Sequence, residues 1–300
     1  MELVGAFACS HAGLIVERRD QAPEGQHDAV YGSFETVRQE IEQLEPDALI
    51  VLATDHMKAW PLQGVPQFSL GVGPTARGLG DGGMEPCRIP VHQVFAQSLL
   101  EQMVASGVDL AFSEDVAIDH SFVTPLSLLT PNFDVPIVPM TQNCNVPPRP
   151  TFARSREVGA WLGEAIQHGP KGRVVLVGTG GLSHWVGSQR RQDFMRRPAG
   201  TRLADLKDHP VEISDDGPIN ASWDRDFLRY VEEGRLSEVA DAWSPDDVEE
   251  AAGNGAQEIR QWLTVAAAAG DPPAKTLAYE PVAAWLTGTA VVRFEVTNDA

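Results

Sequence analysis

Four histidines follow short apolar runs of the chain and could act together: His11, His56, His120 and His184. Short apolar runs rich in β-branched residues predict strands that are buried on both faces. In open α/β sheets the carboxyl ends of parallel strands meet at one edge, and sites are built there. An imidazole at such an edge can bind a metal or transfer a proton, although a single histidine is more often structural. We therefore expect these four to converge. The remaining four are interpreted as structural: His27, His92, His168 and His209.

Glu258 is a candidate partner for these histidines because it interrupts an apolar helix face. At about 100° per residue, Trp262 and Val265 lie on the same side of the predicted helix as Glu258. An unpaired buried carboxylate is costly, so Glu258 should have a metal or another cation beside it, or else lie at the margin of the apolar stripe. Two imidazoles and one carboxylate on one face of a metal are typical of non-haem iron(II) oxygenases. His11, His56 and Glu258 would form such a set.

The elements that must position these residues alternate between strands and helices. Strands are predicted at 3–9, 48–53, around 109–112, at 135–140 and at 173–177, with helices at 33–44, 91–106 and 152–168 between them. This order predicts the α/β class, with a mostly parallel sheet and helices on both faces. The run at 135–140 is strand-like, although Pro136 and Pro139 favour a sheet edge or an extended segment there. We expect a single domain over residues 1–300, whose C-terminal part from about residue 220 is helical.

The composition of the chain limits the kinds of partner that we expect it to bind. The chain has 300 residues, 23 basic and 42 acidic, and a formal net charge of −19, which opposes binding to nucleic acid and to anionic membranes. No apolar run is long enough to span a membrane and no signal peptide is evident, so we expect a cytoplasmic protein with a small-molecule partner. The three cysteines are far apart and form no CxxC pair, so neither a disulfide framework nor a structural zinc site is indicated.

Other motifs point less clearly to a function. The glycine run from Gly178 to Ser183 fails the dinucleotide-binding fingerprint at its last position, and the chain has no Walker, HExxH or GxSxG sequence. Cys9 is best interpreted as a small apolar strand residue with muted reactivity. A cluster of arginines could attract an anionic substrate or form a solvated helix face: Arg190, Arg191, Arg196, Arg197 and Arg202.

Taken in order, the candidate motifs resemble a known family, the class III extradiol ring-cleavage dioxygenases. The motifs are Ser10-His11, Thr54-Asp55-His56, Asp119-His120, the glycine stretch from Gly178 to His184, and Glu258 with Trp262. The similarity runs nearly end to end and is greatest to members that cleave 2,3-dihydroxyphenylpropionate. This chain has Ser121 where that pattern has glycine, and its segment between His184 and Asn220 is shorter, a difference that could affect substrate selection.

The resemblance implies the chemistry and the residue roles. It implies that His11, His56 and Glu258 bind Fe(II), that His184 is the proton acceptor and that His120 is the proton donor. The implied reaction is cleavage of a 3-substituted catechol, such as 2,3-dihydroxyphenylpropionate, by O2 to a hydroxymuconate semialdehyde in aromatic catabolism. A homo-oligomer is also implied.

Three points remain open from the sequence. Asp55 and Asp119 could orient neighbouring imidazoles from a second layer around the metal. The chain could instead be a binding protein that kept the fold without the metal. It could also be a Zn(II) hydrolase that uses the same His/His/Glu set.

Overall fold

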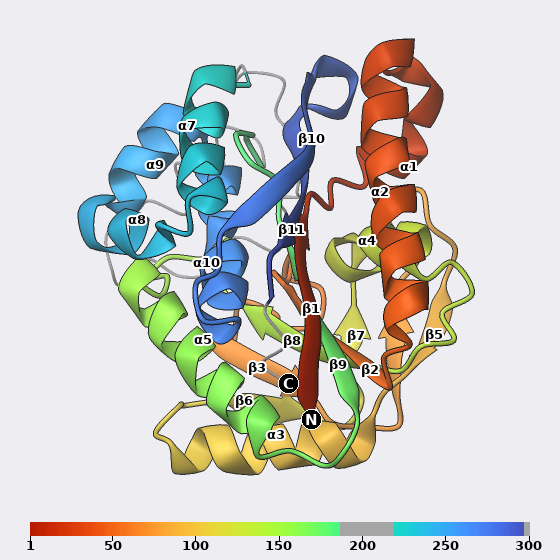
Figure 1. Ribbon diagram of the computed structural model, residues 1–300, viewed down its shortest axis with the longest axis vertical. Helices are drawn as coiled ribbons and strands as arrows, with labels where there is room; N and C mark the ends of the chain where they lie inside the picture. The colour runs from red at the N-terminus through yellow and green to blue at the C-terminus, as the bar shows by residue number, and fades with distance from the viewer. Residues whose placement is uncertain (187–218, 297–300) are drawn as a thin grey trace.

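The computed structural model describes residues 1–186 and 219–296, which fold around a large central sheet (Figure 1). Within this part of the chain the sheet has eight strands in the order β10-β11-β1-β9-β2-β8-β3-β6. Their bounds are β1 Glu2–Cys9, β2 Ala48–Ala53, β3 Phe68–Gly71, β6 Ala111–Ser113, β8 Ile137–Gln142, β9 Arg173–Thr179, β10 Ala274–Val282 and β11 Thr287–Phe294. The four neighbours β1, β9, β2 and β8 pair in parallel, which confirms the predicted mostly parallel α/β sheet.

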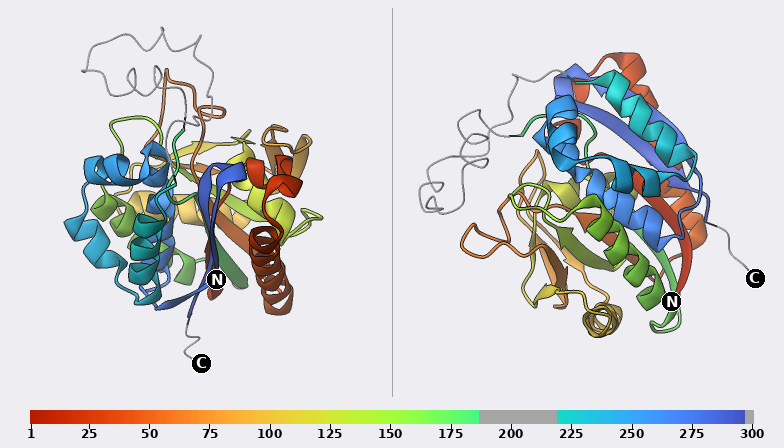
Figure 2. Two further views of the ribbon diagram at one scale, coloured as in Figure 1. Left: turned by 90° about the horizontal axis from the view of Figure 1, so that it is seen from above. Right: turned by 90° about the vertical axis from the view of Figure 1, so that its left-hand side faces the viewer.

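Helices cover both faces of this sheet, as predicted (Figure 2). One face carries α2 Glu24–Leu44 and α4 His120–Leu129, and the other carries α3 Gln93–Ala105, α5 Phe152–Gln167 and α10 Ile259–Ala268. The apolar side chains of β2 are buried along its whole length because the strand lies between these layers. The sheet and its helices therefore form a rigid base whose carboxyl-terminal edge holds the site.

Shorter elements complete the described part of the chain. They are α1 Leu14–Glu17, η1 Arg19–Gln21, α7 Ala221–Glu232, α8 Leu236–Ala242, α9 Pro245–Ala252, η3 Asn254–Glu258 and η4 Ala283–Trp285. Among the described residues, none of the helices combines the length and the apolar composition that a membrane span requires.

A second, small sheet was not predicted; two of its strands lie in the glycine-rich region that follows His56, and the third directly precedes Asp119 and His120. Its strands are β5 Cys87–Pro90, β4 Thr75–Gly78 and β7 Ala117–Ile118, in the order β5-β4-β7. Strand β4 runs parallel to β7, with Gly78 opposite Ile118. The small sheet therefore joins two segments that are about 40 residues apart in sequence, just before each enters the site.

Three expected features differ in the structure. Helix α2 begins at Glu24 rather than near Ser33, because Val30 extends the buried stripe of Phe34 by one more turn. Strand β8 is internal rather than at an edge, with β2 on one side and β3 on the other. It pairs with β3 only from Met140 onwards, so the missing N–H of Pro139 removes no hydrogen bond to β3.

The third difference is at the C-terminal end. The helical part that begins near residue 220 ends at Ala268, and residues 274–294 return to the sheet as the hairpin β10–β11. Strand β11 is buried between β10 and β1 and therefore shows no alternation of apolar and polar residues. Without that alternation, and without a two-residue glycine turn, the hairpin had no clear sequence signal.

Candidate metal centre

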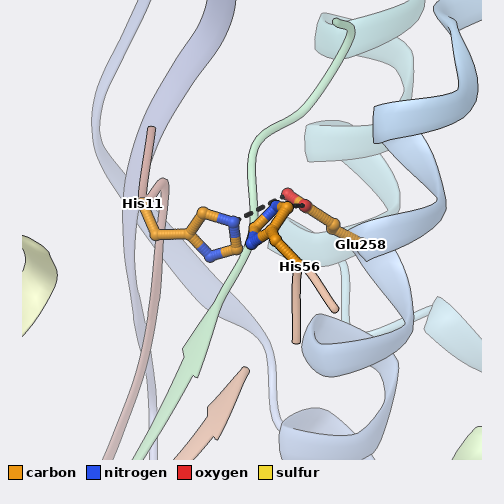
Figure 3. A group of neighbouring side chains, drawn as sticks. All are labelled: His11, His56 and Glu258. Atoms are coloured by element: carbon orange, nitrogen blue, oxygen red, sulfur yellow. Dashed lines mark ion pairs between the residues drawn. The ribbon is translucent and has the colours of Figure 1, made fainter. Parts of the chain in front are cut away.

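Three side chains from distant parts of the chain meet at the carboxyl-terminal edge of the main sheet (Figure 3). His11 follows β1, His56 follows β2, and Glu258 is the last residue of η3, directly before α10. All three are buried, with Glu258 0% exposed. Nε2 of His11 lies 3.2 Å from Oε2 of Glu258, and Nε2 of His56 lies 3.6 Å from its Oε1. The predicted convergence of these residues is therefore present.

Hydrogen bonds behind the two imidazoles fix their orientation. Nδ1 of His11 lies 2.9 Å from the hydroxyl oxygen of Thr179, whose own proton goes to the carbonyl oxygen of Ser121. Nδ1 of His56 lies 3.1 Å from a carboxylate oxygen of Asp119. In both pairs the imidazole Nδ1–H must be the donor, because the hydroxyl and the carboxylate act there as acceptors. Each ring therefore directs its Nε2 towards Glu258.

The charges at this centre are tightly coupled. Burial alone would raise the pKa of Glu258, but the neighbouring His11 and His184 hold it well below its usual value. Burial lowers the pKa of His11. Burial would also lower the pKa of His56, yet the Asp119 carboxylate and Glu258 raise it to about 10. A positive charge is therefore strongly favoured beside Glu258 and Asp119, whether a proton or a metal cation supplies it.

The donor set fits a first-row divalent metal. Oε2 of Glu258 accepts a hydrogen bond from the amide of Gly181 at 2.8 Å, whereas its buried Oε1 has no hydrogen-bond partner. Buried carboxylate oxygens are rarely left unpaired unless an ion or water is their partner. Among the described residues the ion-pair partners of Glu258 are histidines, so an arginine does not neutralise it. Two imidazole nitrogens and one carboxylate on one side suit a metal with open positions.

His184 and His120 lie around this group. Nε2 of His184 is 3.7 Å from Oε2 of Glu258, and its Nδ1 donates to the carbonyl oxygen of Leu182 at 2.9 Å. The ring of His120 stacks on that of His56 with centroids 4.4 Å apart. Nδ1 of His120 lies 2.8 Å from a carboxylate oxygen of Asp81. All four predicted histidines therefore face one pocket.

The two aspartates proposed to orient imidazoles behave differently. Asp119 contacts His56, but the prediction for Asp55 is wrong. Its carboxylate accepts hydrogen bonds from the backbone amides of Lys58, Ala59 and Trp60, so it closes the loop after β2. A short loop that begins with an Asp commonly uses the side chain this way, and the local Asp-His pattern does not reveal it.

Sequence reasoning missed Asp81, which lies in a glycine-rich turn next to His120. A lone acidic residue flanked by glycines has no periodic pattern that would mark it. Its only signal was its position inside a long, irregular loop of a kind that is often functional.

Apolar side chains form part of the pocket lining. They include Leu14, Trp185, Trp285 and Leu286. Two charged side chains, Lys58 and Glu17, also line it. This lining suits a flat aromatic ring, with polar groups directed to the histidines and a substituent towards the opening. The predicted arginine cluster at 190–202 lies outside the described residues.

Comparisons with known proteins agree with this geometry. Residues 5–292 match the family described as the catalytic LigB subunit of aromatic ring-opening dioxygenase. A 2,3-dihydroxyphenylpropionate/2,3-dihydroxicinnamic acid 1,2-dioxygenase of Rhodococcus jostii (strain RHA1) is 29% identical and covers 96% of this chain and 97% of its own. A protein of the same name from Klebsiella pneumoniae (strain 342) is 30% identical, over 87% of this chain and 89% of its own.

A solved structure shows the same fold at low sequence identity. An uncharacterized protein of Escherichia coli K12 superposes with a TM-score of 0.56 at 16% identity, covering 97% of this chain and 99% of the other. The family match spans nearly the whole described chain and includes the metal-type cluster. The chain therefore belongs to the family of the catalytic LigB subunit of aromatic ring-opening dioxygenases.

Proposed function

We propose that this protein cleaves a catechol by the extradiol route, with Fe(II) and O2. The observation that carries the proposal is the buried group of His11, His56 and Glu258, whose ligand atoms lie within 4.8 Å of one another and in which one carboxylate oxygen has no hydrogen-bond partner. The family and the names of the relatives support ring cleavage. The substrate we propose is a 3-substituted catechol such as 2,3-dihydroxyphenylpropionate.

In this proposal His11, His56 and Glu258 hold the iron. Iron bound there supplies the electron transfer between the catechol and dioxygen that the protein side chains cannot provide. The protein keeps these three ligands rigid through Thr179, Asp119 and the amide of Gly181, which leaves the pocket side open for the substrates.

His184 is the proposed proton acceptor for the catechol hydroxyl. Its Nδ1–H is committed to the carbonyl oxygen of Leu182, so the lone pair lies on Nε2. That nitrogen lies 3.7 Å from Oε2 of Glu258, and the His184 side chain lines the pocket that would take the catechol. A neutral imidazole in this place can remove the proton that catechol must lose.

His120 is the proposed proton donor on the other side of the pocket. It is the first residue of α4, directly after the small sheet, and it lines the same pocket as His184, stacked on His56. When its Nε2 carries a proton, the Asp81 carboxylate on Nδ1 provides a partner for the resulting charge. An acceptor and a donor from separate elements can therefore act on opposite sides of one substrate.

The pocket and the relatives together support the choice of substrate. Two aromatic side chains of the pocket lining, Trp185 and Trp285, suit a substituted ring, and Lys58 offers a positive charge for an anionic substituent. The relatives are named for 2,3-dihydroxyphenylpropionate and the related cinnamate. A cytoplasmic location and a homo-oligomeric assembly stay predictions.

Anaerobic reconstitution tests the function directly. Purified protein is loaded with Fe(II) and offered 2,3-dihydroxyphenylpropionate, unsubstituted catechol and protocatechuate in air-saturated buffer. We expect a yellow ring-opened semialdehyde and one O2 consumed for each catechol cleaved. Protein loaded with Zn(II) is the control and should be inactive. Absence of colour and of O2 uptake with every catechol would contradict the proposal, and turnover that does not need O2 would favour a hydrolase.

A further inference from the structure

Asp81 makes a short contact with His120, although the two residues are far apart in sequence. Oδ2 of Asp81 lies 2.8 Å from Nδ1 of His120, and both side chains line the pocket. The residue next to His120 in the chain, Asp119, does not make this contact, because its carboxylate binds His56 and Ser121. His120 therefore has its own carboxylate, supplied from a different loop.

The small sheet explains why this pair meets. Strands β4 and β7 run in parallel with Gly78 opposite Ile118, and the amide of Leu79 extends the pairing to the carbonyl of Ile118 at 3.0 Å. Asp81 then lies three residues beyond Gly78, and His120 two residues beyond Ile118. The two side chains leave the same end of the small sheet. The 40-residue separation in sequence is thus bridged by strand pairing.

Glycines hold the Asp81 turn in place. Gly80, Gly82 and Gly83 have φ angles of +74°, +61° and +79°, a backbone region that other residues rarely adopt. A Cβ on Gly82 would lie 2.7 Å from Cβ of His120 and 3.0 Å from Cα of Gly13. The turn is therefore wedged between the residue that it orients and the loop that carries His11.

We propose that Asp81 is the positioning residue of His120, fixing its ring orientation and its Nδ1–H tautomer so that Nε2 faces the metal pocket. A carboxylate oxygen only accepts hydrogen bonds, so it selects the ring nitrogen that donates. A histidine without such a partner favours the Nε2–H tautomer in water and can rotate its ring. Loss of Asp81 would then let the ring turn away from the substrate, and it would remove the partner of the charge that His120 carries when Nε2 holds the proton to be donated. The tautomer claim stands alone, whereas its catalytic consequence rests on the proposed function.

The tautomer can be measured without any turnover. In metal-free protein with ¹⁵N-labelled histidine at mildly alkaline pH, the His120 signals, assigned with His120→Gln, should report a protonated Nδ1 and an unprotonated Nε2. Asp81→Ala should lose this pattern, and Asp81→Asn, which keeps an acceptor oxygen, should retain it in part. The matched control is Asp28→Asn, which alters an exposed Asp–His pair, His27 with Asp28 at 2.9 Å, and should leave His120 unchanged. An unchanged His120 pattern in Asp81→Ala would overturn the inference, provided that its unfolding transition shows a folded protein.

A double-mutant cycle tests the catalytic consequence. In iron-loaded protein, Asp81→Ala should lower kcat about 100-fold with little change in KM or iron content, because it misdirects a group that acts on the proton and not on binding. In a His120→Gln background the same change should alter kcat less than about twofold, since the group through which Asp81 acts is gone. Equal losses in both backgrounds would mean that Asp81 acts elsewhere. If no variant, nor the natural protein, cleaves a catechol, the proposed function fails while the tautomer measurement still decides the role of Asp81.

Discussion

Asp119 binds His56 at two points with one carboxylate oxygen. Its Oδ2 accepts hydrogen bonds from the backbone amide of His56 at 2.8 Å and from the ring Nδ1 at 3.1 Å. The other oxygen accepts from the amide and the hydroxyl of Ser121. Both the loop after β2 and the imidazole that it carries are thus held by a single fully buried carboxylate. Asp119 is therefore the residue on which the geometry of this proposed metal ligand depends most.

Replacement of Asp119 by Asn should weaken metal binding. The neutral amide makes His56 a poorer ligand and leaves its ring less firmly oriented, and such partners typically contribute 10-fold to 100-fold in metal affinity. We expect a loss of about that size for Fe(II), measured by competition with a chelator under anaerobic conditions. Asp115→Asn is the matched control, because Asp115 is exposed and makes only a 3.9 Å ion pair with Arg77. Equal affinities for the natural protein and Asp119→Asn would contradict this role.

The metal-free protein should lose stability as the pH rises above 6.5. His56 has a folded pKa of about 10, raised by Asp119, against an ordinary value of 6.5. A raised folded pKa stabilises the native state fully below the ordinary value, and this contribution is lost as the pH approaches the folded value. Between pH 6.5 and 8.5 the native state holds from about half a proton to about one proton more than the unfolded state, so the free energy of unfolding should fall by about 1 kcal/mol per pH unit.

The comparison of the natural protein with Asp119→Asn isolates this effect. Without the carboxylate the pKa of His56 has lost its main raising cause, so the slope with pH should be shallower. Urea unfolding of both metal-free proteins at several pH values provides the measurement. The quantity to compare is the difference between the two slopes. Other groups, such as the amino terminus of Met1 with its lowered pKa, also titrate in this range, but they contribute equally to both proteins and cancel in the difference. Parallel slopes for the two proteins would refute the assignment.

The five residues of the site should separate into two classes when mutated. His56→Ala should lose iron, because it removes a ligand atom. His120→Gln and His184→Gln should retain iron but lose turnover by about 10²-fold to 10⁴-fold, the usual contribution of a positioned acid or base. Iron content by elemental analysis and kcat from semialdehyde absorbance give the two readouts. Equal iron loss in all three variants would remove the distinction between metal ligands and proton-transfer residues.

The convergence of the four histidines was predictable. An apolar run followed by a histidine can be recognised in the local sequence, and parallel strands bring their carboxyl ends to one edge of the sheet. Glu258 was also visible, since one carboxylate on an apolar helix face requires a partner. Arg260 in the same helix carried no such signal, yet it is 0% exposed, with its guanidinium donating to the carbonyls of Pro150 and Gln257. The periodicity of a helix shows which residues share a face, but it cannot show that other parts of the protein pack against both faces.

What escaped prediction depends on pairing between distant segments. The small sheet that brings Asp81 to His120 uses strands of two to four residues, too short for any period to be recognised. The hairpin β10–β11 is buried against β1, so its second strand lacks the alternation that marks exposed sheets. The roles of Asp55 and Asp119 could not be told apart, because each precedes a histidine and only the fold decides which ring is near.

A buried carboxylate beside His184 should be important for stability. Asp224 is fully buried, and burial raises its pKa. It accepts hydrogen bonds from the amide and hydroxyl of Ser183 at 2.7 and 2.8 Å and from the hydroxyl of Tyr279 at 2.7 Å. It thus ties the glycine turn to α7 and β10. Asp224→Ala leaves these donors unpaired and should lower the free energy of unfolding by about 3 kcal/mol or more.

Tyr279→Phe provides the graded control for that prediction. It removes one of the three hydrogen bonds to Asp224 while leaving the carboxylate with its two bonds to Ser183. A loss of about 1 kcal/mol is expected, as for a single hydrogen bond. Urea unfolding of the natural protein and both variants shows which variant loses more free energy of unfolding. A larger loss for Tyr279→Phe than for Asp224→Ala would show that the network is not centred on Asp224.

The ring of His184 occupies the space next to Gly255 where a side chain would lie. Gly255→Ala should therefore lower activity without loss of iron. A Cβ there would lie 2.2 Å from Nε2 of His184, and the amide of Gly255 donates to the carbonyl of His184 at 3.1 Å, so neither group can move away easily. We expect kcat to fall about as far as in His184→Gln while iron content is retained. Gly32→Ala in α2 is the control: a Cβ meets nothing within 4 Å there, and helix stability should rise by about 0.5–1 kcal/mol. If Gly255→Ala keeps full activity, the His184 ring does not occupy the position on which its proposed role as proton acceptor depends.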